Sequence, residues 1–491
     1  MSGTNPYDST ALADVVLCSS DRVDFHVLKT FLCYVSPIFK DLFNLSQESA
    51  TEEHQRRNGL PVIPVTETSK TLRLLLDSIY PQEYEPQLND ATLFLNVAKA
   101  AQKYCMKKVE NKFRRRIINS SLMISRPFRM YAIAIDLEWE DVAIHAARQT
   151  LQTPLDKLPR ARELNNITGS GFYRFLEYRL RCESSSKPSV EQLMKLPKAT
   201  PYGGVDSTPG VVDASKPFDS SAPSDIILRS SNGVDFFVIE SLIRIASPSQ
   251  SLTLLNPGGQ VRDGRTVFQI PEESSVLYQL LCLIYPYADQ LDMHNCRLYI
   301  WVVLALRRYG MTATETRLQA QAATTPLLSK EPMRVYIVAS ALGWNDLAKS
   351  AALNTLSQPL AEMVYMEQFD LITGMDLHQL MAFRFKCADA ACDVINLNAM
   401  YSKYGPGHWS KHHSSYEHNG PTKERVFGKL RSCPRGLTIA EAYTVEDNVL
   451  GTLQSDSRMT ISKSAFIKMM QCRREIEGAV EAAVAKASFD S

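Results

Sequence analysis

The first 65 residues contain short runs in which apolar and polar positions alternate, as they do in half-buried strands. Residues 13–20 (ADVVLCSS) and 23–27 (VDFHV) predict two strands joined by a turn. Residues 60–65 (LPVIPV) predict a third strand. The expected apolar face of the first strand pair consists of Val16, Cys18, Val23 and Phe25.

Apolar residues at helical spacing surround and follow these strands. Ser36-Pro37 has the form of a helix start, because a serine hydroxyl caps open amides and proline fits the first turn. Thr68 or Ser69 is placed to cap a later helix, residues 91–104 predict another, and the pattern stays helical to Arg181. In the helix that starts at Ser36-Pro37, the apolar residues at helical spacing are Ile38, Phe39, Leu42 and Phe43. In the helix capped by Thr68 or Ser69, the expected apolar face consists of Leu72, Leu75, Leu76 and Ile79.

This pattern occurs twice in the chain. Residues 125–151 match residues 330–356 without a gap, and the same offset of 205 relates LRLLLDSIYP (72–81) to LYQLLCLIYP (277–286) upstream. Still further upstream, VDFHV matches VDFFV at an offset of 211, so six extra residues lie in the first copy, in a polar loop at 46–59. A self-match at a fixed offset indicates a duplicated structural unit.

The repeat limits and the composition between them divide the chain into parts. Residues 183–224 are rich in Ser, Pro and Gly and predict a flexible linker. Residues 462–489 predict a terminal helix, whose apolar side we expect to pack back on the second unit rather than meet a partner. That side consists of Ala465, Ile467, Met470, Ile476, Val480 and Val484. The predicted parts are a first domain (14–118), its helical extension (119–182), the linker (183–224), a second, divergent domain (225–323), its extension (324–387) and a C-terminal region (388–491).

Several segments recur in the same order in both copies. In the first they are Asp14, DFHVLK, Ser36-Pro37-Ile38-Phe39, LLLDSIYP and AKAAQKYCM, and in the second Asp225, VDFFVIE, Ser247-Pro248, LLCLIYP and LALRRYGM. This order resembles that of a BTB (POZ) domain, particularly in the BTB proteins abundant in fungi. The resemblance implies an α+β fold with two BTB/POZ-like units, each a small sheet capped by helices and followed by an all-helical extension, plus a helical C-terminal tail. His26 becomes Phe237 and Phe39 becomes Gln250, so the second copy is interpreted as a divergent structural partner.

The resemblance also implies protein binding and often dimerisation, and therefore a non-enzymatic interaction scaffold or adaptor. Only 13 residues precede Asp14 and polar sequence precedes Asp225, which leaves little room for the N-terminal helix of many BTB dimers. We expect the two copies to pair within one chain, because the linker gives each a high effective concentration for the other.

Two other functions stay open. A substrate adaptor of a cullin-RING ubiquitin ligase would bind a cullin through the first copy. However, the hydrophobic-x-Glu element of such domains is not clean in LFNLSQES (42–49), and LLNPGG (254–259) lacks it. A nuclear transcription-regulatory scaffold would use BTB contacts to assemble transcription factors, although no zinc finger or other DNA-binding module accompanies the repeats.

The composition limits the classes of partner that we expect. A net charge of +1 over 491 residues gives no basic excess, so direct nucleic-acid binding is not expected. The sequence has no apolar run of roughly 20 residues and no basic-then-apolar N-terminal pattern, so we expect no membrane partner and no export. Ten dispersed cysteines fit reduced thiols. The expected location is intracellular, in the cytoplasm, the nucleus or both.

Candidate chemistry is sparse. Because no nucleophile, base and electrophile binder come together in a motif, we predict no enzymatic activity and no catalytic or cofactor-binding residues. Residues 420–430 (GPTKERVFGKL) have seven residues between their glycines where a phosphate loop has four. His408 and His412 in the His-rich stretch 405–418 have a spacing open to a zinc pair, but interrupting Gly, Pro and Ser favour a polar surface loop, so no metal ligand is assigned.

Three further features have competing interpretations. The basic run at 107–116 (KKVENKFRRR) is typical of a solvated helix end, with a nuclear import signal or a nucleic-acid contact as alternatives. Trp139 and Trp344 are expected in the core. Arg129 and Arg334 are expected either to contact a partner or to pair with Asp141 and Asp346.

Overall fold

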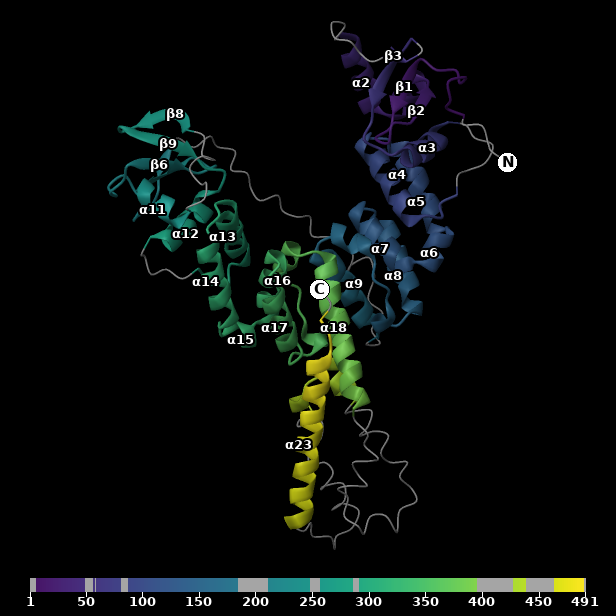
Figure 1. Cartoon of the computed structure of the whole chain (residues 1–491). Helices are drawn as coiled ribbons and strands as arrows, with labels where there is room; N and C mark the ends of the chain where they lie inside the picture. The colour runs from purple at the N-terminus through teal and green to yellow at the C-terminus, as the bar shows by residue number, and fades with distance from the viewer. Residues whose placement is uncertain are drawn as a thin grey trace, which may run out of the picture. The chain divides into compact units, whose positions relative to one another are not determined.

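The structure, a computed structural model, describes residues 6–48, 56–57, 59–80, 87–183, 211–247, 257–285, 291–394, 427–438 and 463–489 (Figure 1). Its mixed α+β fold divides into two units. The first comprises Met1–Ile167 with Arg174–Leu196, and the second Thr168–Tyr173 with Pro197–Ser491.

The sheet of the first unit has the strand order β2-β1-β4-β3. Strand β1 (Val15–Cys18) runs antiparallel to β2 (Asp24–Val27) and parallel to β4 (Leu60–Pro64), and β3 (Arg56–Arg57) pairs with the outer edge of β4. The prediction of one apolar face was wrong, because Val15, Val16 and Leu17 are all buried while Val23 is exposed. An inner strand of this kind is covered on both faces, so apolar residues follow one another instead of alternating.

Five helices accompany this sheet, and serine or threonine caps begin two of them. They are α1 (Lys29–Val35), α2 (Pro37–Glu48), α3 (Ser69–Ile79), α4 (Ala91–Lys103) and α5 (Lys107–Ile118). The Ser36 hydroxyl accepts a hydrogen bond from the Phe39 amide at 3.1 Å, and the Thr68 hydroxyl accepts one from the Thr71 amide at 3.4 Å. Both predicted helix starts are therefore confirmed.

The helical extension of the first unit consists of α6 (Ser121–Ser125), α7 (Pro127–Asp136), α8 (Glu140–Gln149), a 3-10 helix η3 (Arg162–Asn166) and α9 (Gly169–Glu183). Trp139 is buried, as predicted, and its indole donates to Glu110 Oε1 at 2.7 Å. The predicted pairing of Arg129 with Asp141 was wrong. Arg129 donates instead to Glu163 Oε1 at 2.6 and 2.9 Å, because the buried Glu163 of η3 needs a cation more than an exposed carboxylate does.

The sheet of the second unit has five strands in the order β5-β7-β6-β9-β8. They are β5 (Val212–Asp213), β6 (Ile226–Arg229), β7 (Val234–Val238), β8 (Pro257–Arg262) and β9 (Arg265–Gln269). As in the first unit, the inner strand β6 pairs antiparallel with the strand that follows it and parallel with a later one, β9.

The helices of the second unit occur among and after its strands along the chain, as in the first unit. They are α11 (Glu240–Ala246), α12 (Ser274–Ile284), α13 (Cys296–Arg308), α14 (Thr312–Ala323), α15 (Leu327–Lys330), α16 (Pro332–Leu342), α17 (Asn345–Thr355) and α18 (Gly374–Asp393). Trp344 is buried, as predicted. The predicted partner of Arg334 was wrong as well, since Arg334 Nε donates to Glu331 at 2.6 Å, the carboxylate one helical turn before it.

The last part of the predicted linker belongs to the second unit. Phe218 is buried, its ring lies edge-on to Tyr278 and Tyr285, and its carbonyl accepts the Phe237 amide at 3.0 Å. A flexible linker up to Ser224 is therefore wrong for residues 211–224. The sequence contains a signal for this contact, because PFDS at 217–220 repeats PYDS at 6–9 at the offset of 211. In the first unit the Tyr7 carbonyl likewise accepts the His26 amide at 2.9 Å.

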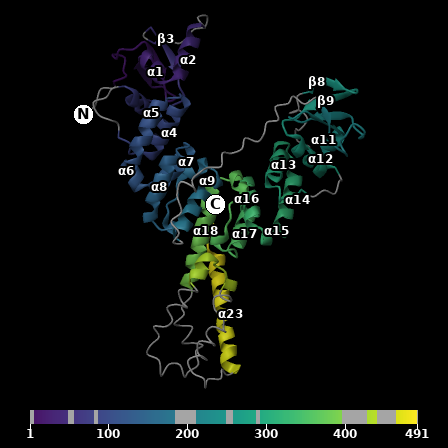
Figure 2. The ribbon, with the colours of Figure 1, turned by 180° about the vertical axis from the view of Figure 1, so that it is seen from behind.

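The terminal helix α23 (Lys463–Lys486) lies along α18 in both views (Figures 1 and 2). Three residues of its predicted apolar side, Ile476, Val480 and Val484, are buried. Beyond the helix end, the Phe489 ring meets the Tyr336 and Phe383 rings at 6.3 and 5.2 Å. The helix therefore packs back on the second unit, as predicted.

Left-handed backbone occurs at equivalent positions in the two units. Arg22, Gly59, Cys105 and Glu138 in the first correspond by their offsets to Gly233, Gly264, Gly310 and Gly343 in the second, and all have φ between 53° and 81°. Three side chains in the first unit thus occupy a conformation that favours glycine.

Glu138→Gly is expected to stabilise the first unit by about 0.5–1 kcal/mol, because the relief of left-handed strain exceeds the added freedom of the unfolded chain. Glu138 is exposed, so few contacts are lost. Chemical denaturation of wild type and variant measures the difference. The matched control is Gly343→Ala, where a Cβ meets nothing within 4 Å and the strain of its φ of 67° should destabilise. A loss of stability in Glu138→Gly would contradict this account.

Candidate functional site

Four large apolar side chains are exposed on the helix pair α1–α2. Phe31 and Tyr34 of α1 are 38% and 74% exposed, and Ile38 and Leu42 of α2 are 40% and 37% exposed. We call these four residues the α1–α2 surface. Exposed apolar side chains that cluster on neighbouring helices are typical of protein interaction sites.

A neighbouring stripe of α2 explains why Ile38 and Leu42 point outward. Phe39 and Phe43 are buried, and the Phe39 ring stacks on Tyr104 at 4.4 Å and on Phe43 at 5.8 Å. Ile38 and Leu42 share the predicted helical spacing with Phe39 and Phe43, but they are exposed. Both pairs have a spacing of four, so they form adjacent stripes on one helix, and only the aromatic stripe meets the core.

Hydrogen bonds fix the helix pair to the rest of its unit. The Lys29 amide donates to Asp14 Oδ1 at 2.7 Å, and the Leu28 amide donates to the Tyr80 hydroxyl at 2.8 Å. Between the two helices, the Ser36 hydroxyl donates to the Tyr104 carbonyl at 2.6 Å. The α1–α2 surface is therefore presented by an anchored scaffold, which lowers the entropy cost of binding.

A cation borders this surface. Lys108 Nζ of α5 lies 4.6 Å from the centroid of the Tyr34 ring and 3.2 Å from its hydroxyl. This contact holds Tyr34 against α5 while leaving most of the ring accessible. The surface therefore offers apolar contact next to a positive charge.

A polar cluster around the largely buried Glu67 carboxylate lies next to Phe39, through the Tyr104 ring that stacks on it. The Tyr104 hydroxyl donates to Glu67 Oε2 at 2.5 Å, and Lys103 Nζ lies 2.8 Å from Glu67 Oε1. Burial, and then the Glu67 carboxylate, raise the pKa of Tyr104. Burial alone would raise the pKa of Glu67, but Lys103 and Tyr104 outweigh it and lower the pKa. The phenol stays protonated and the carboxylate charged, so the cluster ties α4 to the start of α3 instead of activating a nucleophile.

Comparison with known protein families assigns this part of the chain. Residues 4–121 match the model of the BTB/POZ domain. The match contains β1 to β4, α1 to α5 and the α1–α2 surface, and it starts early enough to include the buried Tyr7. A BTB domain implies a role in protein–protein interaction. No curated protein matches the chain.

Part of the basic run, which follows α4 of the BTB domain, contacts nearby side chains. Arg114 donates to Asp141 at 2.5 Å and its guanidinium lies 5.8 Å from the Trp139 ring centroid. Lys108 contacts Tyr34, as described above. These contacts give the run a structural role at the junction of the BTB domain with its extension.

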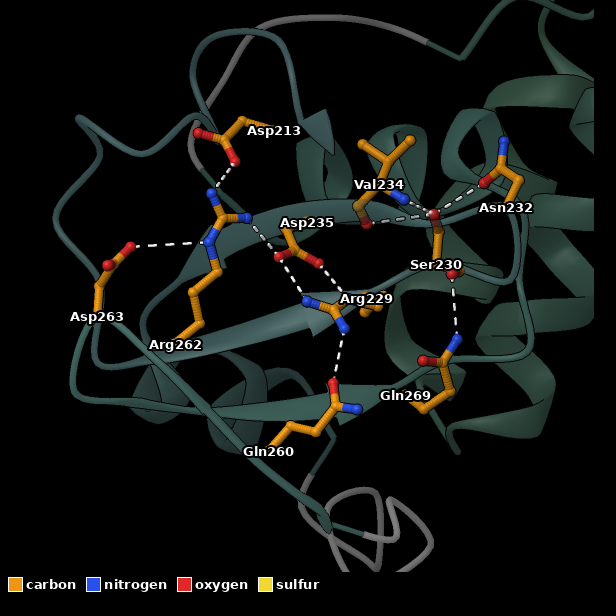
Figure 3. A network of polar contacts seen from close by, with 10 residues as sticks. All are labelled: Asp213, Arg229, Ser230, Asn232, Val234, Asp235, Gln260, Arg262, Asp263 and Gln269. Carbon is orange, nitrogen blue, oxygen red and sulfur yellow. Dashed lines mark hydrogen bonds and ion pairs between the residues drawn. The ribbon is translucent and has the colours of Figure 1, made fainter. Parts of the chain in front are cut away.

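Outside the BTB domain, a cluster of charged and polar side chains surrounds Asp235 on β7 (Figure 3). Asp235 is fully buried and accepts Arg229 at 2.6 and 2.9 Å and Arg262 Nη1 at 2.6 Å. Arg262 also pairs with Asp213 at 2.8 Å, and Arg229 donates to Gln260 at 2.7 Å. Burial alone would raise the pKa of Asp235, but the hydrogen bonds and charges of Arg229 and Arg262 lower it. The cluster ties β5, β6, β7 and β8 together.

Metal and thiol chemistry find little support in the part of the chain that the structure describes. There, no group of three His, Cys, Asp or Glu side chains is placed to hold a metal ion. The stretch 405–418, with His408 and His412, lies outside the described residues. Burial raises the pKa of the Cys387 thiol to about 12, and burial also raises the pKa of Cys296, so neither is an activated nucleophile. Among the described helices, none has the length and apolar character needed to span a membrane.

Proposed function

We propose that the chain is a non-enzymatic interaction scaffold or adaptor, built from two BTB-like units, that binds a protein partner through the α1–α2 surface. One observation carries the proposal. A BTB domain presents Phe31, Tyr34, Ile38 and Leu42 outward on a helix pair that hydrogen bonds hold in place.

Matched contacts support a second BTB-like unit. The Glu240 amide donates to Asp225 Oδ1 at 2.7 Å, as Lys29 does to Asp14, and the Ile239 amide donates to the Tyr285 hydroxyl at 2.8 Å, as Leu28 does to Tyr80. Each partner in one unit has its counterpart at an offset of 211 or 205 in the other. Such matching hydrogen bonds are expected of one structural unit present twice.

The two helical extensions share contacts in the same way. The Trp344 indole donates to Glu315 at 3.2 Å, as Trp139 does to Glu110. Arg384 donates to the carbonyls of Thr355 and Gln358, and Arg179 donates to the equivalent carbonyls of Thr150 and Thr153. These pairs support two extensions, at 119–182 and 324–387, within the proposed domain order.

The described helix α11, the counterpart of α1, differs from α1 in the apolar side chains that it exposes. Only Ile245, the counterpart of Tyr34, is a comparably exposed apolar residue on the described part of α11, at 75%. Under the sheet, Phe237 replaces His26, and the guanidinium groups of Arg262 and Arg265 each lie 5.6 Å from its ring centroid. A ring face suits two cations better than an imidazole does. These differences support a mainly structural role for the second unit, which we propose pairs with the first inside one chain.

The double variant Tyr34→Asp/Ile38→Asp is expected to weaken partner binding by a factor on the order of 10³, because buried anchor residues each contribute about 2 kcal/mol or more at protein interfaces and about 1.4 kcal/mol corresponds to tenfold in affinity. The test is recovery of partners by the tagged, intact protein at its native level, with quantitative mass spectrometry of wild type and variant. Leu12→Asp is the control, since Leu12 is 83% exposed in the same BTB match but lies outside α1 and α2.

The identity of the lost partner separates the finer functions. A stoichiometric cullin, lost with the double variant, would make the protein a substrate adaptor of a cullin-RING ligase. Chromatin factors without a cullin would make it a nuclear regulatory scaffold. Equal recovery by wild type and the double variant would contradict a binding site on the α1–α2 surface.

A further inference from the structure

A short segment from the first helical extension forms part of the second unit. Thr168–Tyr173 belongs to that unit together with Pro197–Ser491. The Gly169 amide donates to the Ile372 carbonyl at 2.8 Å, and Thr168 forms an antiparallel bridge with Thr373. Two extended backbones therefore meet here just before the helices α9 and α18 begin.

Aromatic side chains reinforce this backbone contact. The Tyr173 ring stacks on Phe369 with centroids 5.2 Å apart and planes 20° apart, and its hydroxyl donates to the Met363 carbonyl at 2.8 Å. The Phe172 ring lies edge-on to His378 at 5.6 Å. Tyr173, Phe172 and Phe369 are all buried. Burial of three rings contributes several kcal/mol to such a contact.

The two backbones approach too closely for a side chain at Gly169. A Cβ at that position would lie 2.7 Å from the Phe369 carbonyl oxygen and 3.0 Å from Ile372 Cγ1. The carbonyl belongs to the backbone and cannot swing away as a side chain would. The contact therefore depends on glycine at this position.

The two residues of the bridge, Thr168 and Thr373, are equivalents of each other. Thr168 plus the repeat offset of 205 gives Thr373, and Ile167 plus 205 gives Ile372. The sequence ITG occurs at both places, at 167–169 and 372–374. A patch that binds its own counterpart, residue to equivalent residue, is the mark of a two-fold interface, such as the one between identical subunits.

We infer that the two ITG segments form an internal two-fold junction that joins the two repeats, so that one chain contains the equivalent of a homodimer interface. This inference rests on the proposed duplication and assigns the pairing of the repeats to their helical extensions. A chain whose junction is satisfied internally has no copy of it left for a second chain. The intact protein should therefore be monomeric with respect to this contact.

The test uses the full-length protein with a protease site inserted after Pro197, between the two copies. After cleavage, the wild-type halves are expected to co-elute in size-exclusion chromatography at micromolar concentration. Gly169→Ala should weaken their association at least tenfold, and Tyr173→Ala should do the same. Gly478→Ala is the matched control, because a Cβ there meets nothing within 4 Å.

Circular dichroism and the melting temperature of each uncut variant show that the units remain folded. Wild-type halves that separate on cleavage would overturn the junction, and so would Gly169→Ala halves that stay together as firmly as the wild type. Partner recovery through the α1–α2 surface is measured separately on uncut protein. A failed junction with intact partner recovery therefore leaves the scaffold proposal standing.

Discussion

Asp235→Asn is expected to lower the free energy of unfolding of the second unit by about 3–5 kcal/mol, which is the usual cost of breaking a buried ion pair. Asp235 is fully buried and accepts from both Arg229 and Arg262. A neutral amide cannot balance two guanidinium groups, and its NH₂ points a donor at other donors. The loss follows from leaving Arg229, 15% exposed, and Arg262, 33% exposed, without their shared negative charge, and not from a change in side-chain volume.

The effect should depend on pH. The pKa of Asp235 is lower in the folded chain than its usual value, so its charge stabilises the fold fully above the unfolded pKa of about 4. This stabilisation is lost as the pH falls through the folded value. The difference between wild type and Asp235→Asn should therefore be largest near neutral pH and shrink below about pH 4.

Chemical denaturation at pH 7 and at pH 3, followed by circular dichroism, measures both effects. Asp263→Asn is the control, because Asp263 also faces Arg262, at 3.7 Å, but is largely exposed. An exposed pair contributes about 0–1 kcal/mol, so the control should change little. Similar losses in both variants, or a difference that does not depend on pH, would show that burial of Asp235 does not govern this sheet.

Arg384→Met is expected to destabilise the second unit by about 2–4 kcal/mol, because the buried Thr355 carbonyl left without a donor costs about 1–3 kcal/mol and two part-buried carbonyls lose their donors as well. Arg384 is buried in α18 and donates to the carbonyls of Thr355, Gln358 and Ser432, the last two at 2.7 and 3.0 Å. Methionine keeps much of the stem and removes the donors.

Thermal and chemical denaturation check this prediction, with Arg244→Met as the control. Arg244 is largely exposed and pairs with Glu240 on its own helix, so its loss should cost less than about 0.5 kcal/mol. Hydrogen exchange at α23 adds a specific readout, since Ser432 links α18 to the C-terminal residues. Unchanged stability and unchanged hydrogen exchange at α23 would mean that Arg384 does not hold α18 and the C-terminal residues together.

Much of the fold could be predicted from short-range signals. The helix starts at Ser36 and Thr68 and the buried Trp139 follow from local capping and from apolar spacing. The partner of Arg129 could not be predicted from the sequence, because η3, which supplies Glu163, has no periodic pattern of its own. Composition also misled at Phe218, where a Ser- and Pro-rich stretch contains a residue that packs into the unit.

The candidate site was less predictable than the fold. Ile38 and Phe39 are neighbours of similar hydrophobicity, and only the position of Tyr104 decides which of the two stripes of α2 is covered. That position depends on contacts between residues some 65 apart in the chain. The ITG contact has a sequence signal in its repetition, but the repeat alone does not show that the two copies of ITG meet each other.

Strand β5 determines where the second unit can be cut from the chain. Val212 and Asp213 pair with Val234 and Asp235 along the outer side of β7, and Phe218 follows on the same stretch. An expression fragment that begins at Asp225, the start predicted for the second domain, would uncover the edge of β7 and the rings that Phe218 contacts. Open edges and bare rings favour aggregation. A fragment meant to behave as a folded protein therefore has to begin before Val212.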